Sequence, residues 1–219
     1  MELKGKTINF LGDSITQGCG TSGENAVFHG VLKDRYGLKE VRNYGKGGTR
    51  IARQREITSL LRDEDFILRA SLMNHDADAV VVLGGTNDYG NGQAPLGNIE
   101  DRSMYTFYGA LHTLITNLIN EYCGKAIVFI TPLHRYNENG GVGTWKPEGV
   151  EQRPLKDYVY AVKEVCEYYS VPVLDLYASG ELCGNTSEWY LEYMPDGVHP
   201  NDEAHKIIAD KLGKLLESI

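Results

Sequence analysis

The chain has 219 residues, of which 42% are hydrophobic and 24% are charged, and its 22 basic and 30 acidic residues give a formal net charge of −8. This composition excludes a disordered chain and indicates a globular protein with a substantial buried core. An acidic chain without a long lysine or arginine run repels a phosphate backbone, so we expect no nucleic-acid partner.

Strand-like and helix-like segments alternate along the whole chain. In order, the pattern predicts a strand at 7–11, a helix at 26–36, a strand at 40–44, helical stretches between 51 and 74, a strand at 79–83, a helix at 104–123, a strand at 126–130, a helix at 155–169, a strand at 171–176 and a helix at 202–218. The continuously apolar run at 79–83 is typical of a strand buried on both faces of a parallel sheet. Strands alternating with crossover helices predict an α/β fold, a three-layer α/β/α sandwich.

No linker, repeat or low-complexity tract divides the sequence, so we predict a single domain over residues 1–219. The four cysteines form no C-x-x-C pair, which favours a reduced, cytoplasmic setting. Secretion, with a signal peptide already removed, is the alternative that the sequence leaves open. No apolar stretch of 18 residues occurs, so we expect no membrane span. Whether the chain forms a homo-oligomer is also left open.

The candidate functional residues follow the first three predicted strands. Ser14 follows the first strand, a glycine cluster that includes Gly48 follows the second, and Asn87 follows the third. Ligands of parallel sheets bind at the carboxyl ends of the strands, so we expect these three segments to meet at one edge.

Ser14 is the candidate nucleophile, because it lies in a glycine-bracketed turn directly after a strand. A serine hydroxyl needs an adjacent base and donors aimed at the developing oxyanion. Near the other end of the chain, Asp196 and His199 are three positions apart in a turn fixed by glycine and proline, close enough for the carboxylate to orient the imidazole. The sequence therefore predicts that Ser14, His199 and Asp196 meet in space.

Four motifs occur in a fixed order: Gly-Asp-Ser at 12–14, Gly48 in an Asn-x-Gly-x-Gly-Gly stretch, Gly-x-Asn-Asp at 85–88 and Asp-x-x-His at 196–199. Together they resemble the SGNH, or GDSL-like, hydrolase family, and the resemblance extends from residue 7 to the last helix. Ile15, where the family motif has leucine, is the one small departure. The resemblance implies a flavodoxin-like five-stranded parallel sheet in the order 2-1-3-4-5.

The resemblance also implies roles for five residues. Ser14 would attack an ester carbonyl, His199 would act as general base and then general acid, and Asp196 would orient the imidazole. The oxyanion donors would be the backbone N–H groups of Ser14 and Gly48 and the side-chain amide of Asn87. Ordinary structural roles compete with these: Ser14 as a helix cap, the glycines as a turn or phosphate nest, Asn87 in an Asx turn, and Asp202 as the cap of the last helix.

We therefore expect a serine esterase that removes a small acyl group, such as acetyl, from a carbohydrate or other alcohol and acts on a small-molecule acyl ester. Three alternatives remain: a lipase or lysophospholipase, a noncatalytic carbohydrate-binding module, and a phosphoesterase holding a metal through Asp13 and Asp88. We expect no cofactor and no metal, because the remaining histidines lack zinc-site spacing, and we assign Asp13 and Asp88 structural roles.

Two long connections, 88–103 and 131–154, are predicted to be functional or mobile loops. The second contains His134, Arg135, Tyr136 and Trp145, for which an ordinary loop role and a substrate-contacting role are equally good interpretations. An aromatic side chain at this sheet edge is able to stack on a sugar ring.

Overall fold

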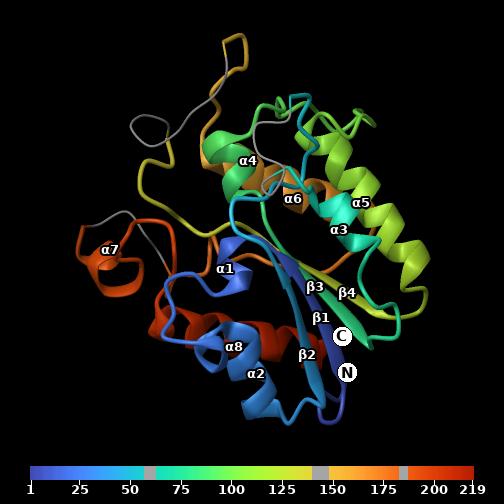
Figure 1. Cartoon of the computed structure of the whole chain (residues 1–219), viewed down its shortest axis with the longest axis vertical. Helices are drawn as coiled ribbons and strands as arrows, with labels where there is room; N and C mark the ends of the chain where they lie inside the picture. Colours follow the sequence, from blue (N-terminus) through green and yellow to red (C-terminus); the bar gives the residue numbers. More distant parts are fainter. Residues whose placement is uncertain (57–62, 140–147, 183–186) are drawn as a thin grey trace.

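The computed structural model describes residues 1–56, 63–139, 148–182 and 187–219 (Figure 1). Its centre is a five-stranded sheet in the order β2-β1-β3-β4-β5, in which every neighbouring pair is parallel. The strands are β1 (Thr7–Gly12), β2 (Glu40–Gly45), β3 (Ala79–Leu83), β4 (Ala126–Ile130) and β5 (Val173–Leu174). The predicted strand order is confirmed.

Alternate residues of each inner strand enter two separate cores. On one face the strands pack against α3 (Phe66–Ala70), α5 (Phe107–Glu121) and α6 (Leu155–Tyr168), and on the other against α2 (Phe28–Tyr36) and α8 (Asp202–Ser218), as Figure 1 shows. In β3, for example, Val80 and Val82 enter the first core, whereas Val81 and Leu83 enter the second. Both faces are therefore buried, which explains the unbroken apolar run and confirms the three layers.

Several predicted boundaries are wrong. Within the described part of the 51–74 segment, only α3 is an α-helix, and residues 57–62 lie outside the described residues. The predicted strand at 171–176 shrinks to β5, because Pro172 has no N–H to donate and the N–H of Leu176 donates to the Thr131 hydroxyl (2.9 Å) instead of continuing the ladder. Four short elements were not predicted: α1 (Ser14–Gln17), the 3₁₀ helix η1 (Glu24–Ala26), α4 (Thr86–Asn91) and α7 (Ser187–Tyr193).

The last helix spans 202–218 as predicted, but its cap is not the residue that the sequence suggested. Asn201, and not Asp202, is its N-cap, and the Asn201 side chain accepts the N–H of Ala204 (3.1 Å). Asp202 instead accepts hydrogen bonds from the backbone N–H and the hydroxyl of Ser22. This pair links α8 to the segment that follows α1.

No helix within the described ranges combines the length and apolar character needed to cross a bilayer. Cys19, Cys123 and Cys166 are free thiols, and Cys183 lies outside the described residues.

The fully buried His205 couples folding to pH. Its Nδ1 accepts the N–H of Phe28 (3.1 Å), and burial lowers the pKa of His205 to about 3. The unfolded chain binds this proton near pH 6.5, so the unfolded state holds more protons between about pH 3 and 6.5. Stability is therefore greatest above pH 6.5 and falls as the pH decreases.

We expect acidification from pH 7 to pH 4 to cost on the order of 3 kcal/mol of unfolding free energy through His205. His205→Asn keeps an acceptor for Phe28 but cannot titrate, so its stability should depend less steeply on pH. Urea unfolding at a series of pH values measures this slope. His75→Asn, at a largely exposed position, is the matched control. If the unfolding free energy of the wild type and of His205→Asn depends equally steeply on pH, His205 is not the group responsible.

Candidate active site

Ser14 is the first residue of α1 and lies one residue beyond Asp13, the N-cap that follows β1. The Asp13 carboxylate accepts the N–H of Ile15 (2.9 Å) and so fixes the turn. Gly12 permits the turn, because a Cβ there would collide with the Thr16 side chain. Ser14 is therefore not the cap itself, and its hydroxyl is held at the carboxyl end of β1, an inner strand of the sheet.

Ser14, His199 and Asp196 form one continuous chain of hydrogen bonds. The Nε2 atom of His199 lies 2.9 Å from the Oγ of Ser14, a residue 185 positions away, and its Nδ1 lies 2.6 Å from Oδ2 of Asp196. The backbone N–H groups of Val198 and His199 donate to Oδ1 of Asp196 (2.9 and 2.7 Å). The structure thus brings the three predicted residues together.

The carboxylate of Asp196 is stabilised in its ionised form. Burial alone raises its pKa, but the hydrogen bonds from the backbone and imidazole of His199 and from the backbone of Val198 outweigh burial and hold the pKa of Asp196 below its usual value. A permanently charged Asp196 favours the tautomer in which Nδ1 of His199 carries the proton and Nε2 is free to accept one from Ser14.

Gly48 and Asn87 follow the two strands that flank β1. Gly45 and Leu83, near the starts of these connections, both pair with Gly12 in the sheet register. Gly48 has φ +75°, which suits glycine, and among the described residues its N–H has no hydrogen-bond acceptor. The Asn87 side-chain amide donates one hydrogen bond to the carbonyl of Thr49 (3.1 Å), which leaves its second N–H for a ligand.

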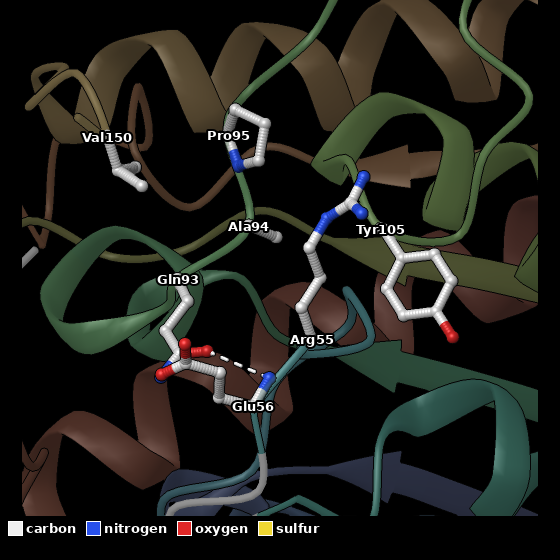
Figure 2. Close-up of a pocket in the computed structure, with 7 residues that line it drawn as sticks. All are labelled: Arg55, Glu56, Gln93, Ala94, Pro95, Tyr105 and Val150. Atoms are coloured by element: carbon white, nitrogen blue, oxygen red, sulfur yellow. Dashed lines mark hydrogen bonds between the residues drawn. The ribbon is translucent and has the colours of Figure 1, made fainter. Parts of the chain in front are cut away.

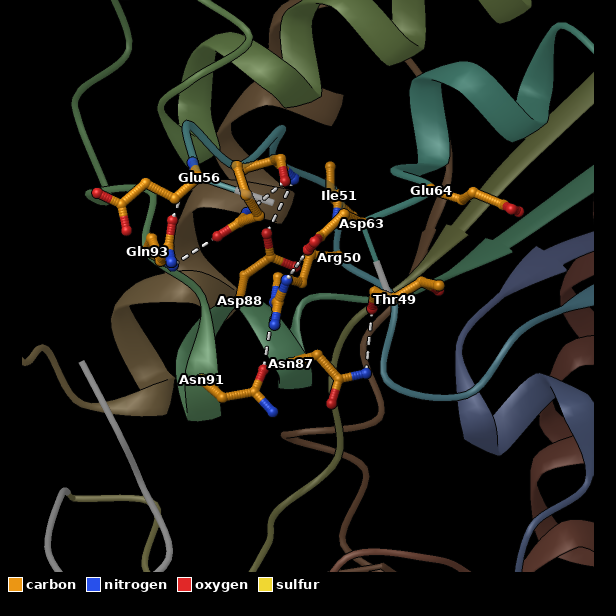
Figure 3. A network of polar contacts seen from close by, with 12 residues as sticks. Thr49, Arg50, Ile51, Glu56, Asp63, Glu64, Asn87, Asp88, Asn91 and Gln93 are labelled. Atoms are coloured by element: carbon orange, nitrogen blue, oxygen red, sulfur yellow. Dashed lines mark hydrogen bonds and ion pairs between the residues drawn. The ribbon is translucent and has the colours of Figure 1, made fainter. Parts of the chain in front are cut away.

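A buried polar network joins the segment after Gly48 to α4, as Figure 3 shows. The carboxylate of Asp88 accepts the N–H groups of Ile51 (3.0 Å) and Ala52 (2.9 Å). Arg50 donates to Asn91 (3.3 Å) and forms a buried ion pair with Asp63 (2.9 Å). Asp88 therefore holds the backbone beyond Gly48 against the helix that carries Asn87, which is the structural role expected for it.

Asp13 is also buried next to the site. Burial raises the pKa of Asp13 to about 6, opposed by its hydrogen bond with Ile15 and by the nearby His199 and Arg69 charges. Arg69 in turn donates to the hydroxyl of Thr49 (2.8 Å) and to the carbonyl of Tyr44 (2.5 Å). These two hydrogen bonds of Arg69 stabilise the connection that follows β2. The carboxylates of Asp13 and Asp88, which the sequence offered as metal ligands, both accept backbone N–H groups. Among the residues with described positions, no group of three or more His, Cys, Asp or Glu side chains gathers as a metal site.

The aromatic and basic residues of the 131–154 connection divide into two groups. His134 and Arg135 are buried, and Arg135 donates to the carbonyl and hydroxyl of Thr86 (both 3.1 Å). Tyr136 is exposed and lies beside the Asp196–His199 turn, because its N–H donates to the carbonyl of Gly197 (2.8 Å). Trp145 lies outside the described residues.

Sequence reasoning missed the buried carboxylate of Glu138. It accepts hydrogen bonds from His134 Nδ1 (2.7 Å), the Arg135 N–H (3.3 Å) and the Tyr177 hydroxyl (3.1 Å). The i, i+4 spacing of His134 and Glu138 was the available signal, but only the fold reveals that both are buried.

A pocket borders this network just after the end of α4, and Glu56 and Gln93 belong to both (Figure 2 and Figure 3). None of the five predicted site residues lines it. Its lining residues are Arg55, Glu56, Gln93, Ala94, Pro95, Tyr105 and Val150.

Comparison with known proteins agrees with the fold and with the motif order. The model of the GDSL-like lipase/acylhydrolase family matches residues 10–207. A crystal structure of a protein from Lactobacillus plantarum is 31% identical, with 98% of each chain covered and a TM-score of 0.83. The comparison with curated proteins finds no match.

More distant structures share the fold. A possible lipase from Chitinophaga pinensis is 22% identical, with 97% of this chain and 98% of that chain covered and a TM-score of 0.70. A two-domain esterase active on acetylated mannans is 18% identical, with 99% of this chain and 50% of that chain covered and a TM-score of 0.61. On the family match, which spans most of its length, this chain belongs to the GDSL-like lipase/acylhydrolase family and is a carboxylic ester hydrolase.

Proposed function

We propose that the protein is a serine esterase that removes a small acyl group, such as acetyl, from a carbohydrate or another alcohol through an acyl-enzyme. The observation that carries this proposal is the hydrogen-bonded chain from Ser14 through His199 to Asp196, with distances of 2.9 and 2.6 Å. This geometry supports acyl transfer in which Ser14 would be the nucleophile, His199 the base and Asp196 the orienting carboxylate.

In the proposed reaction, the Oγ of Ser14 attacks the ester carbonyl carbon while Nε2 of His199 takes its proton. The tetrahedral intermediate then collapses, the bond to the alcohol oxygen breaks, and the leaving alcohol receives the proton from His199. Water attacks the acyl-enzyme with His199 again as the base, which releases the carboxylic acid and restores Ser14. Asp196 stays ionised throughout and stabilises the imidazolium.

Three donors are proposed for the negative oxygen of the tetrahedral intermediate. They are the backbone N–H groups of Ser14 and Gly48 and the free N–H of the Asn87 amide, which the hydrogen bond to Thr49 orients. Fixed donors of this kind need no reorganisation when charge develops on the substrate oxygen.

Two considerations support a small, neutral ester. One relative of the same fold acts on acetylated mannans. The exposed carboxylate of Asp196 and the net charge of −8 disfavour a phospholipid phosphate. Hydrolysis rates over a series of p-nitrophenyl esters of increasing acyl length separate an acetylesterase from a lipase.

We expect a fluorophosphonate probe to label Ser14 stoichiometrically. Ser14→Ala should abolish labelling and ester hydrolysis, and His199→Ala should slow both by at least about 10³-fold, because the hydroxyl then lacks its base. Ser71→Ala, which removes an exposed serine hydroxyl at the end of α3, is the control. Labelling that persists in Ser14→Ala would overturn the proposed nucleophile.

Loss of the Asn87 amide should lower kcat by about 10²- to 10³-fold and leave KM nearly unchanged, because this donor acts mainly on the tetrahedral intermediate. Steady-state kinetics of Asn87→Ala with p-nitrophenyl acetate measure the effect. Asn120→Ala, at an exposed position near the end of α5, is the control. A change in KM alone would assign Asn87 to ground-state binding.

Asp88→Asn should destabilise the fold by about 2 kcal/mol, because one of the two buried N–H groups of Ile51 and Ala52 then faces an amide donor. Since the segment beyond Gly48 is held by the same carboxylate, kcat should fall as well. Urea unfolding and kinetics report the two effects, with the exposed Asp34→Asn as control. Wild-type stability and kcat in Asp88→Asn would show that this clamp is dispensable.

A further inference from the structure

The segment from His134 to Glu138 bridges the two sides of the active site. On one side, Arg135 donates to Thr86 and the hydroxyl of Tyr89 donates to the carbonyl of Asn137, which ties the segment to α4. On the other side, the N–H of Tyr136 donates to the carbonyl of Gly197 (2.8 Å). In Figure 1 this stretch of yellow chain runs between α4 and α7.

The first atoms of the Tyr136 side chain contact the turn that carries His199. A Cβ at Gly197 would come within 2.7 Å of the Tyr136 Cβ, so glycine at this position makes room for the tyrosine. His199 returns the proton to the departing alcohol in the proposed reaction, whereas the proposed oxyanion donors Gly48 and Asn87 belong to other strand ends. Tyr136 therefore lies on the side of the site from which the alcohol departs.

The Tyr136 ring is held in place but remains open to solvent. Its side chain is 61% exposed, and its ring meets the ring of Tyr190 edge to face at 5.9 Å. Tyr190 packs against the buried Trp189 at 5.2 Å. Since most of the ring is exposed, core packing does not account for an aromatic residue at this position.

Buried contacts fix the backbone beneath the ring. Glu138 accepts hydrogen bonds from His134, from the Arg135 N–H and from Tyr177, and the rings of His134 and Tyr177 stack at 3.8 Å. The carbonyl of Glu138 also accepts the N–H of Leu155 at the start of α6 (2.8 Å). A surface built this way loses little conformational freedom when a ligand binds.

The charge near the ring disfavours an anionic ligand. The side chain of Asp196, next to the Gly197 that Tyr136 contacts, is exposed, and the whole chain carries a net charge of −8. Anionic alcohols are repelled here, whereas a neutral sugar offers an apolar C–H face to the ring.

We propose that Tyr136, supported by Tyr190, is a specificity-determining residue that stacks on the neutral sugar ring of the departing alcohol, so that the substrates are acetylated glycosides. This inference rests on the proposed function and adds the alcohol class and the residue that recognises it.

The test compares two acetate esters that differ only in the alcohol: an acetylated methyl glycoside and ethyl acetate. Tyr136→Ala should lower kcat/KM for the glycoside about tenfold, chiefly by raising KM, and change the value for ethyl acetate less than twofold. Tyr136→Phe should retain most activity on both esters. Tyr168→Ala is the matched control, because Tyr168 is also 61% exposed but ends α6, at the opposite end of the sheet.

The rate of fluorophosphonate labelling of Ser14 reports whether each variant keeps an intact catalytic site. If Tyr136→Ala lowers kcat/KM equally on the two esters, or does not lower it on the glycoside, the sugar-stacking role is overturned. If Ser14 is still labelled in that case, the proposed serine mechanism is unaffected. On the p-nitrophenyl ester series, a loss confined to long acyl chains and shared by Leu191→Ala, on the exposed face of α7, would assign the surface to acyl chains and overturn the proposal. Absence of Ser14 labelling in the wild type would overturn the proposed function as well.

Discussion

The parallel pairing of β1 with both β2 and β3 is the constraint on which the site depends. In this register Gly12 pairs with Gly45 and with Leu83, so three connections leave the sheet at the same level. Ser14, Gly48 and Asn87 follow within a few residues of those ends. A shift of register would move the candidate nucleophile relative to both proposed oxyanion donors.

Buried carboxylates convert this rough proximity into fixed geometry. Asp13 caps α1 beneath Ser14, Asp88 holds the N–H groups of Ile51 and Ala52, and Glu138 anchors the segment beside the Asp196–His199 turn. Asp88 and Glu138 each accept two or more hydrogen bonds, which offset the cost of burial, whereas the pKa of Asp13 stays raised, at about 6. The same arrangement recurs at three connections, and in each the carboxylate acts on backbone rather than on substrate.

The inner side of the site is buried in the protein, and its outer side is open to solvent. Ser14 is nearly buried, whereas the Asp196 side chain is 56% exposed, and the neighbouring Tyr136 ring faces solvent. A hydrogen-bonded chain from Ser14 to Asp196 beside an accessible aromatic ring suits the proposed enzyme, which would bind the alcohol of its ester at the surface. This combination connects the proposed chemistry with the proposed preference for neutral sugars.

The sequence by itself determined the layered fold, the strand order by resemblance, and the identity of the residues that meet at the site, because apolar periodicity and ordered motifs are local signals. It missed α1, α4 and α7, which are too short to show a helical period. It overextended the helical prediction between 51 and 74, where Asp88, distant in sequence, holds the N–H groups of Ile51 and Ala52 in a connection that is not helical. Only the tertiary structure separated Tyr136 from the buried His134 and Arg135, three neighbours that the sequence left equivalent. Their exposure depends on Glu138, Thr86 and Gly197, which long-range folding brings to them.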